Sequence, residues 1–126
     1  MDSEDLRAAG AARRAVLGDA YVDRATADRD PVAAEFQDYV TATAWGVWTR
    51  GVLSHRDRGL LVLAMTAALG RMEEFHLHVS SAPRAGVTDK EIDELLFQVV
   101  AYCGAPAGIS ARRVVKAVRA EREPDA

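Results

Sequence analysis

Apolar residues recur at helical spacing along most of this chain, whereas the alternating pattern typical of β-strands is scarce. The pattern is most regular after residue 91, where a single apolar stripe follows the spacing of a helix: Ile92, Leu95, Leu96, Val99, Val100 and Cys103. Thr88 and Glu91 precede this stripe with the spacing of a capping box, and Gly104 follows it as a helix-ending glycine. The chain is therefore predicted to be an all-α, compact domain of five to six helices.

Other helices are predicted from apolar spacing and from residues that begin or end helices. The first occupies roughly residues 3–17, and the next spans about 31–43, with Pro31 in its first turn. A polar connector separates these two helices, and the irregular stretch 45–51 ends the second. The helix expected at 55–69 is apolar on nearly every side, which predicts a central helix or one at a subunit interface.

Length and charge limit the classes of protein to which the chain can belong. A chain of 126 residues is expected to form one domain over residues 1–126, with a charged C-terminal tail at 121–126 that frays. The chain has 16 basic and 19 acidic side chains, so no general positive field predicts binding to nucleic acid or to an anionic membrane. A bound anion would have to be held by a few local arginines.

The apolar segments and the N-terminus predict a cytoplasmic protein. The longest apolar run, at about 60–69, is too short to span a bilayer. Residues 1–5 lack the basic and apolar regions of a signal peptide. The single cysteine, Cys103, excludes an intrachain disulfide and a Cys-x-x-Cys redox pair, and its place on the apolar stripe predicts a buried residue without a chemical role.

The strongest candidate for chemistry is the set Arg71, Glu74 and His78, whose i, i+3, i+7 spacing places all three on one helix face. They share this sector with buried-type residues such as Phe75, so they are expected at the polar edge of an inward face. A purely structural interpretation is also open: Glu74 and His78 would form an i, i+4 hydrogen bond, and Arg71 would pair with a carboxylate from another helix. His76 falls on nearly the opposite face and is expected to meet solvent.

A metal site is a further interpretation of this helix, since a glutamate and a histidine four residues apart on a helix can share one ion. Glu74 and His78 have this spacing, but His76 diverges from His78. The helix then offers two ligands where a catalytic zinc usually takes three, so no metal is predicted.

Three motifs together carry a family resemblance. They are Glu-x-x-x-His-Val at 74–79, Gly-Val-Thr-x-x-Glu-Ile at 86–92 and Tyr-Cys-Gly-x-Pro at 102–106. In this order and spacing they resemble the carboxymuconolactone decarboxylase family of the alkylhydroperoxidase (AhpD-like) helical superfamily, over a core of about residues 15–120. The two redox cysteines of the wider superfamily fall on Arg71 and Glu74, so disulfide exchange at that place is excluded.

The resemblance implies decarboxylation of 4-carboxymuconolactone, a small dicarboxylate lactone, to 3-oxoadipate enol-lactone in the protocatechuate branch of aromatic catabolism, with no cofactor. It implies His78 as the proton donor and Glu74 as the group that orients it or favours its charged form, although the reverse assignment stays open. Other side chains are candidates for binding a substrate carboxylate or covering its ring, namely Arg50, Arg58, Arg71, Trp45 and Trp48. Surface ion pairing for the arginines and core packing for the tryptophans are equally good explanations.

The sequence also departs from the family pattern, and two other functions stay open. Glu73 stands where family members often have histidine, and the two tryptophans are one residue closer together. The alternatives are a thiol-dependent peroxidase or reductase, against which the lone Cys103 argues, and a non-catalytic helical oligomer that binds small anions. The chain is expected to form a homo-oligomer, and the resemblance implies a hexamer or trimer. His55 is expected to be a surface residue.

Overall fold

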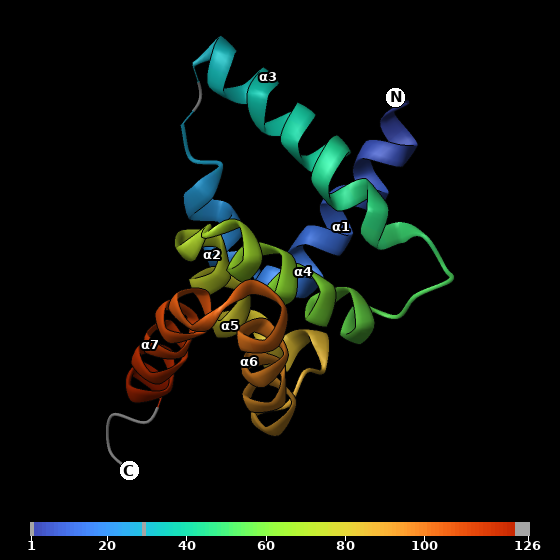
Figure 1. Cartoon of the computed structure of the whole chain (residues 1–126). Helices are drawn as coiled ribbons and strands as arrows, with labels where there is room; N and C mark the ends of the chain where they lie inside the picture. The colour runs from blue at the N-terminus through green and yellow to red at the C-terminus, as the bar shows by residue number, and fades with distance from the viewer. Residues whose placement is uncertain (1, 29, 123–126) are drawn as a thin grey trace. The chain divides into compact units, whose positions relative to one another are not determined.

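The computed structural model describes residues 2–28 and 30–122, and this part of the chain is helical and without strands (Figure 1). The order of elements is α1 (Ser3–Leu17), α2 (Asp19–Ala25), α3 (Pro31–Val40), a π-helical turn η1 (Thr41–Trp45), a 3-10 helix η2 (Gly46–Thr49), α4 (His55–Leu69), α5 (Met72–Ala85), α6 (Asp89–Cys103) and α7 (Ala105–Arg122). The all-α prediction is confirmed, with seven α-helices in the described residues rather than five or six. The connector predicted after the first helix contains the short helix α2.

The internal contacts of the chain gather into two compact units, one up to His55 and one from Arg56 onward. The prediction of one domain over the whole chain stays a prediction. The tail was expected to fray from residue 121, but α7 continues through Arg122, so that boundary was wrong by two residues. The remainder of the tail, 123–126, lies outside the described residues. No helix in the described ranges has both the length and the apolar character needed to cross a bilayer.

In the first unit, α1 packs against η1 and η2, and α3 leads directly into η1. Arg13 is buried in this unit, and its guanidinium donates to Gln37 Oε1 at 3.0 Å and to Thr41 Oγ1 at 3.1 Å. Burial lowers the pKa of Arg13 from its ordinary value. These bonds join α1 to the end of α3, where the helix changes from α-helical to π-helical hydrogen bonding.

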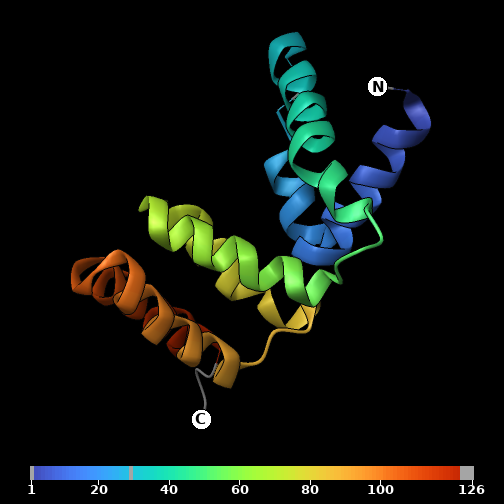
Figure 2. The same ribbon diagram turned by 45° about the vertical axis from the view of Figure 1, so that its right-hand side comes forward.

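In the second unit, α4, α5, α6 and α7 share one apolar core. Its most buried large side chains come from all four helices and include Leu63, Phe75, Val79, Ile92, Val115 and Val118. Figures 1 and 2 show α6 and α7 side by side, in agreement with their direct contacts. Removing this much apolar surface from water is the main force that orders the unit.

Local signals explain the boundaries of α6. The predicted capping box is present: the Glu91 N–H donates to Thr88 Oγ1 at 3.1 Å, and the Thr88 N–H donates to Glu91 Oε1 at 2.9 Å. The helix ends at Gly104, whose φ of 94° favours glycine, and α7 begins immediately after it with Pro106 in its first turn. The tight turn brings α6 and α7 together as a helical hairpin.

Candidate active site

Helix α5 carries two of the three residues that the sequence predicted on one face. Arg71 is the N-cap, with φ −86° and ψ 74°, so it precedes the helix, whereas Glu74 is in the first turn and His78 is one turn later. Arg71 and Glu74 are exposed and His78 is half-buried, while Phe75 and Val79 hold the inner side of α5 in the core. The prediction of an inward polar edge thus applies to His78 and was wrong for the two exposed residues. The reason is that Arg71 precedes the helix and Glu74 lies at an exposed edge of its first turn, whereas His78 lies one turn further along.

Burial dominates the electrostatics of His78. It lowers the pKa of the imidazole to about 4, and the nearby Glu74 charge raises the pKa by a smaller amount. The imidazole is therefore neutral at pH 7 in the unliganded protein. Glu74 favours the charged form, as the resemblance implied, but its effect is smaller than that of burial.

Arg71 is held by its backbone and leaves its side chain available. Its N–H donates to the Thr66 carbonyl at 2.9 Å, and its own carbonyl accepts from the Phe75 N–H at 2.9 Å. Within residues 2–28 and 30–122, the Arg71 guanidinium shows no hydrogen bond or ion pair. The interpretation that Arg71 pairs with a carboxylate from another helix is therefore not supported in this part of the chain. An exposed cation therefore begins the helix that carries His78.

Arg58 belongs to the same unit and lies near the start of α4, where it is half-buried. Its neighbour Arg56 forms ion pairs with Asp57 and Glu91, which join the start of α4 to the start of α6. Arg58 stays a candidate for binding a carboxylate.

The tryptophans and Arg50 belong to the first unit. Trp45 and Trp48 are 6% and 5% exposed, and their rings stack with centroids 5.2 Å apart and planes at 29°. Such burial fits a packing role, while a role in covering the substrate stays a proposal. Arg50 follows η2 and is exposed.

His55, which the sequence analysis placed on the surface, is half-buried against Trp48. Its Nε2 lies 3.2 Å from the Trp48 carbonyl oxygen, and its ring meets the Trp48 ring edge-on with centroids 5.5 Å apart. The surface prediction was wrong because it considered only the position in the first turn of α4 and not the preceding aromatic segment. An aromatic residue seven positions before a histidine is a weak signal, and the sequence alone did not point to this contact.

Cys103 is exposed, which corrects the prediction of a buried thiol. Together with Tyr102 it lines an apolar groove of about 720 Å³ between α4 and α6, beside Leu61 and Met65. The apolar stripe of α6 is broader than the core it faces: its buried ridge is made by Ile92, Leu96 and Val99. Sequence spacing identifies such a stripe but not which part of it is covered.

The remaining predictions concern His76 and a metal site. His76 points away from the Glu74 side of α5 and lies 3.7 Å from a Glu121 carboxylate oxygen, with a side chain 44% exposed. Among the residues that the structure describes, no three or more His, Cys, Asp or Glu side chains are placed together as metal ligands.

Comparison with known proteins supplies the context for this site. The model of the carboxymuconolactone decarboxylase family matches residues 34–117. The chain is 34% identical to 4-carboxymuconolactone decarboxylase of Acinetobacter baylyi over 107 residues, which cover 84% of this chain and 80% of that protein. It is 36% identical to nitrosuccinic acid decarboxylase of Metarhizium robertsii over 105 residues, which cover 82% of this chain and 73% of that protein.

Both relatives are decarboxylases by name, which supports a carboxy-lyase activity for this fold and sequence. The matched region includes α5 and therefore Arg71, Glu74 and His78. The chain belongs to the carboxymuconolactone decarboxylase family.

Proposed function

We propose that this protein is a cofactor-free decarboxylase that converts 4-carboxymuconolactone to 3-oxoadipate enol-lactone in aromatic catabolism. The observation that carries the proposal is the pair on α5: a half-buried, neutral His78 whose pKa responds to the Glu74 carboxylate one turn away. A shielded imidazole beside a carboxylate is suited to moving one proton.

The substrate supplies its own electron sink. One carboxylate leaves from the ring carbon that is conjugated through the double bond to the lactone carbonyl. When this C–C bond breaks, CO2 departs and the electron pair spreads into the carbonyl as a dienolate. A proton then adds to the carbon next to the carbonyl, which completes the enol-lactone. The protein has to hold the remaining carboxylate, stabilise the oxygen charge and deliver that proton.

His78 is the proposed proton donor, and substrate charge is the proposed cause of its protonation. Burial keeps the imidazole neutral in the unliganded protein. A bound dianionic substrate adds negative charge next to His78 and so favours the imidazolium. Glu74 acts in the same direction and orients the ring; the reverse assignment, with Glu74 as the acid, is the competing mechanism.

Arg71 is the proposed clamp for the carboxylate that stays on the product. A guanidinium can bind both carboxylate oxygens, and Arg71 begins the helix that carries His78. Arg50 and Arg58 are further candidates for this role, and the stacked Trp45 and Trp48 are the candidates for covering the ring.

Nitrosuccinic acid is a second substrate candidate because the chain resembles a decarboxylase named for it. It too has two carboxylates, and a carbanion formed next to a nitro group is stabilised as a nitronate. The shared chemistry is loss of one carboxylate from a carbon attached to an electron sink, followed by protonation of carbon.

The same protein is proposed to assemble with copies of itself, as a hexamer or trimer. Leu61, Met65 and Leu69 are 44%, 57% and 74% exposed along one side of α4, at i, i+4, i+8 spacing. An apolar stripe of this kind is typical of a subunit interface. Sedimentation of the wild type and of Met65→Glu tests it: the charged variant is expected to dissociate, and an unchanged assembly would place the interface elsewhere.

The proposed reaction is tested by supplying purified protein with freshly generated 4-carboxymuconolactone and, separately, nitrosuccinate, while CO2 release is measured without added cofactor. Release from either compound identifies the substrate class. Turnover of peroxide that depends on Cys103, with no CO2 from either acid, would favour the thiol-dependent alternative.

A further inference from the structure

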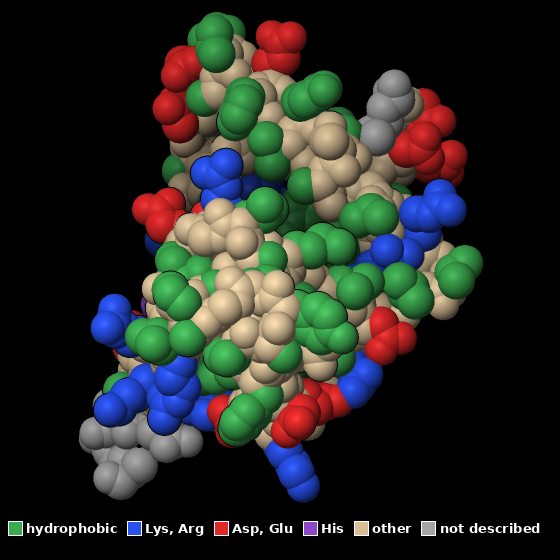
Figure 3. Space-filling model, in the orientation of Figure 1, with side chains coloured by type: hydrophobic (Ala, Val, Ile, Leu, Met, Phe, Trp, Pro, Cys, Tyr) green, Lys and Arg blue, Asp and Glu red, His purple; other side chains and the backbone are tan. Residues whose placement is uncertain are grey.

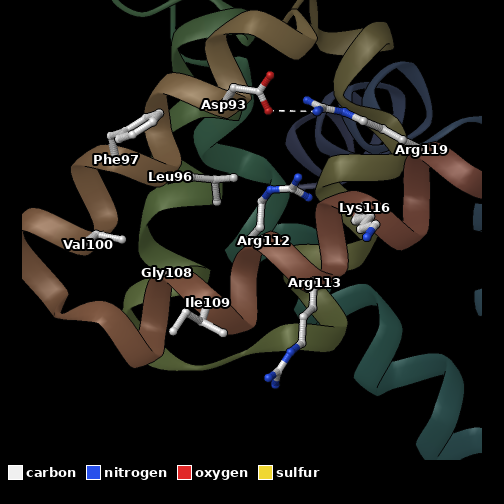
Figure 4. A pocket seen from close by; sticks show the side chains of 10 residues that line it. All are labelled: Asp93, Leu96, Phe97, Val100, Gly108, Ile109, Arg112, Arg113, Lys116 and Arg119. Atoms are coloured by element: carbon white, nitrogen blue, oxygen red, sulfur yellow. Dashed lines mark hydrogen bonds and ion pairs between the residues drawn. The ribbon is translucent and has the colours of Figure 1, made fainter.

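A second groove lies between α6 and α7. Its volume is about 770 Å³, and neither Arg71, Glu74 nor His78 lines it (Figure 4). At one end the two helices approach closely, because a Cβ added to Gly108 would lie 2.2 Å from Val100 Cγ2. The groove is therefore a property of the α6–α7 hairpin.

The floor and one wall of this groove are apolar and open to solvent. Leu96 is buried at the floor, whereas Phe97, Val100 and Ile109 are 72%, 44% and 51% exposed. Three large apolar side chains exposed in one groove are typical of a site that takes an apolar group.

The other wall is positively charged. Arg112, Arg113, Lys116 and Arg119 line the groove against a single carboxylate, Asp93, which leaves a local excess of three positive charges on a chain whose net charge is −3. Figure 3 shows Lys and Arg side chains gathered over α7 on the face drawn. This excess decides the sign of charge that the groove attracts.

The four cations are not equivalent. Arg119 is fixed by Asp93 Oδ1 at 2.8 Å and by the Asp89 carbonyl at 2.9 Å. In the described part of the chain, Arg112, Arg113 and Lys116 show no carboxylate partner. Figure 4 shows Arg112 beside Leu96 between the two helices, while the Arg113 guanidinium points away from Asp93. The available positive charges therefore lie directly beside the apolar floor.

We propose that the α6–α7 groove binds a small amphipathic anion, with a carboxylate on Arg112 and Lys116 and an apolar body against Phe97 and Ile109. Arg112 and Lys116 are one helical turn apart, so both can reach one carboxylate. Neither an apolar body alone nor a charge alone uses both walls, so the ligand class is an organic acid with a medium-length alkyl or aromatic body. This site does not depend on the proposed decarboxylation.

The probe is octanoate, titrated into 15N-labelled protein while the amide signals of α6 and α7 are followed. Acetate, which lacks the apolar body, and 1-octanol, which lacks the charge, are titrated in parallel. Octanoate is expected to shift signals along residues 96–116 and to bind at least about tenfold more tightly than either comparison compound, and more weakly as salt is raised. Octanol binding as tight as octanoate would overturn the proposed role of the arginine and lysine.

Charge reversal on the cationic wall gives the second test. Arg112→Glu with Lys116→Glu is expected to weaken octanoate binding at least about tenfold, because attraction becomes repulsion. Arg7→Glu with Arg84→Glu makes the same change in net charge at exposed positions outside the groove and is expected to bind like the wild type. Equal affinity in all three proteins, or equal weakening in both variants, would overturn the site.

A matched pair of apolar changes tests the other wall. Phe97→Ser is expected to weaken binding, whereas Phe36→Ser removes a comparably exposed ring, at 61%, from α3 and is expected to have no effect. The three altered side chains of the groove, Phe97, Arg112 and Lys116, are exposed, and circular dichroism of each variant checks that the helices are retained. If octanoate fails to bind and sedimentation shows that the charge-reversal variant has lost self-association, the groove is a subunit interface and the proposal is wrong.

Discussion

Glu74 stands one helical turn before His78 on α5, and its charge raises the pKa of His78 against the stronger lowering effect of burial. The two effects act on the same ring and have opposite signs. The unliganded imidazole is consequently neutral near pH 7, and added negative charge from a substrate works in the same direction as Glu74. The proposed site thus couples anion binding to protonation of one side chain.

Glu74→Gln is expected to lower the pKa of His78 further, because the variant removes the charge that favours the imidazolium. The pH titration of the His78 imidazole C2–H signal in NMR measures this. Glu73→Gln is the matched control, since Glu73 is the adjacent exposed carboxylate and is not among the causes of the His78 shift. An identical His78 titration in wild type and Glu74→Gln would contradict the coupling.

His78 is also expected to make stability depend on pH in a defined window. Its pKa falls from 6.5 in the unfolded chain to about 4 in the folded protein, so between these values the unfolded state binds the extra proton. Stability is therefore complete above pH 6.5 and decreases as pH falls toward 4, by up to roughly 3 kcal/mol at about 1.4 kcal/mol per pKa unit. Urea unfolding of wild type and His78→Gln at several pH values checks this, and the variant should lose that slope.

A second group separates this effect from general acid denaturation. Hydrogen bonding to Arg122 lowers the pKa of Asp89 below 3.8, so its contribution is present above that value and is lost as pH falls through the lowered pKa. The Asp89 window lies below the His78 window. A slope between pH 6.5 and 4 that persists unchanged in His78→Gln would show that another group causes it.

Gly108→Ala is expected to destabilise the protein by about 1–3 kcal/mol, because the new methyl group of α7 would lie only 2.2 Å from Val100 Cγ2 of α6. Gly10→Ala in α1 has no neighbouring atom within 4 Å and is expected to stabilise by about 0.5–1 kcal/mol through helix propensity. Urea unfolding compares the two. Adding Val100→Ala to Gly108→Ala should recover part of the loss, and equal stability of the two single variants would contradict the close approach.

Cys103 is expected to react with one equivalent of Ellman's reagent in the folded Met65→Glu variant, because the thiol is exposed at the α4–α6 groove. The wild type is expected to react more slowly if its assembly covers this groove. Labelling is followed by absorbance with and without urea. A thiol that reacts in the folded variant only after urea is added would contradict the exposed position.

Regular helices were predictable from the sequence, and irregular ones were not. The Thr88 and Glu91 capping box and the stop at Gly104 predicted α6 because these signals are local. The π-helical turn at Thr41–Trp45 follows α3 without an interruption in the sequence pattern, and the stacking of its tryptophan on Trp48 depends on contacts with α1. Such tertiary contacts leave no periodic signal.

The sequence predicted which residues of the candidate site share a helix, but not how exposed each of them is. The spacing of Glu74 and His78 correctly predicted that they would be one turn apart on a helix. It could not show that the helix starts after Arg71, nor that burial would dominate the pKa of His78, because both depend on how the surrounding helices pack. For the same reason the exposure of Cys103 was missed.

Proton transfer by His78 is tested by comparing CO2 release from 4-carboxymuconolactone by the His78→Gln and His76→Gln variants. His76 lies on the other side of α5, near Glu121, so its variant controls for the loss of one imidazole from the same helix. We expect a kcat at least about a hundredfold lower in His78→Gln, as is typical for loss of a general acid, and wild-type turnover in His76→Gln. Wild-type turnover in a well-folded His78→Gln protein would contradict proton transfer by His78.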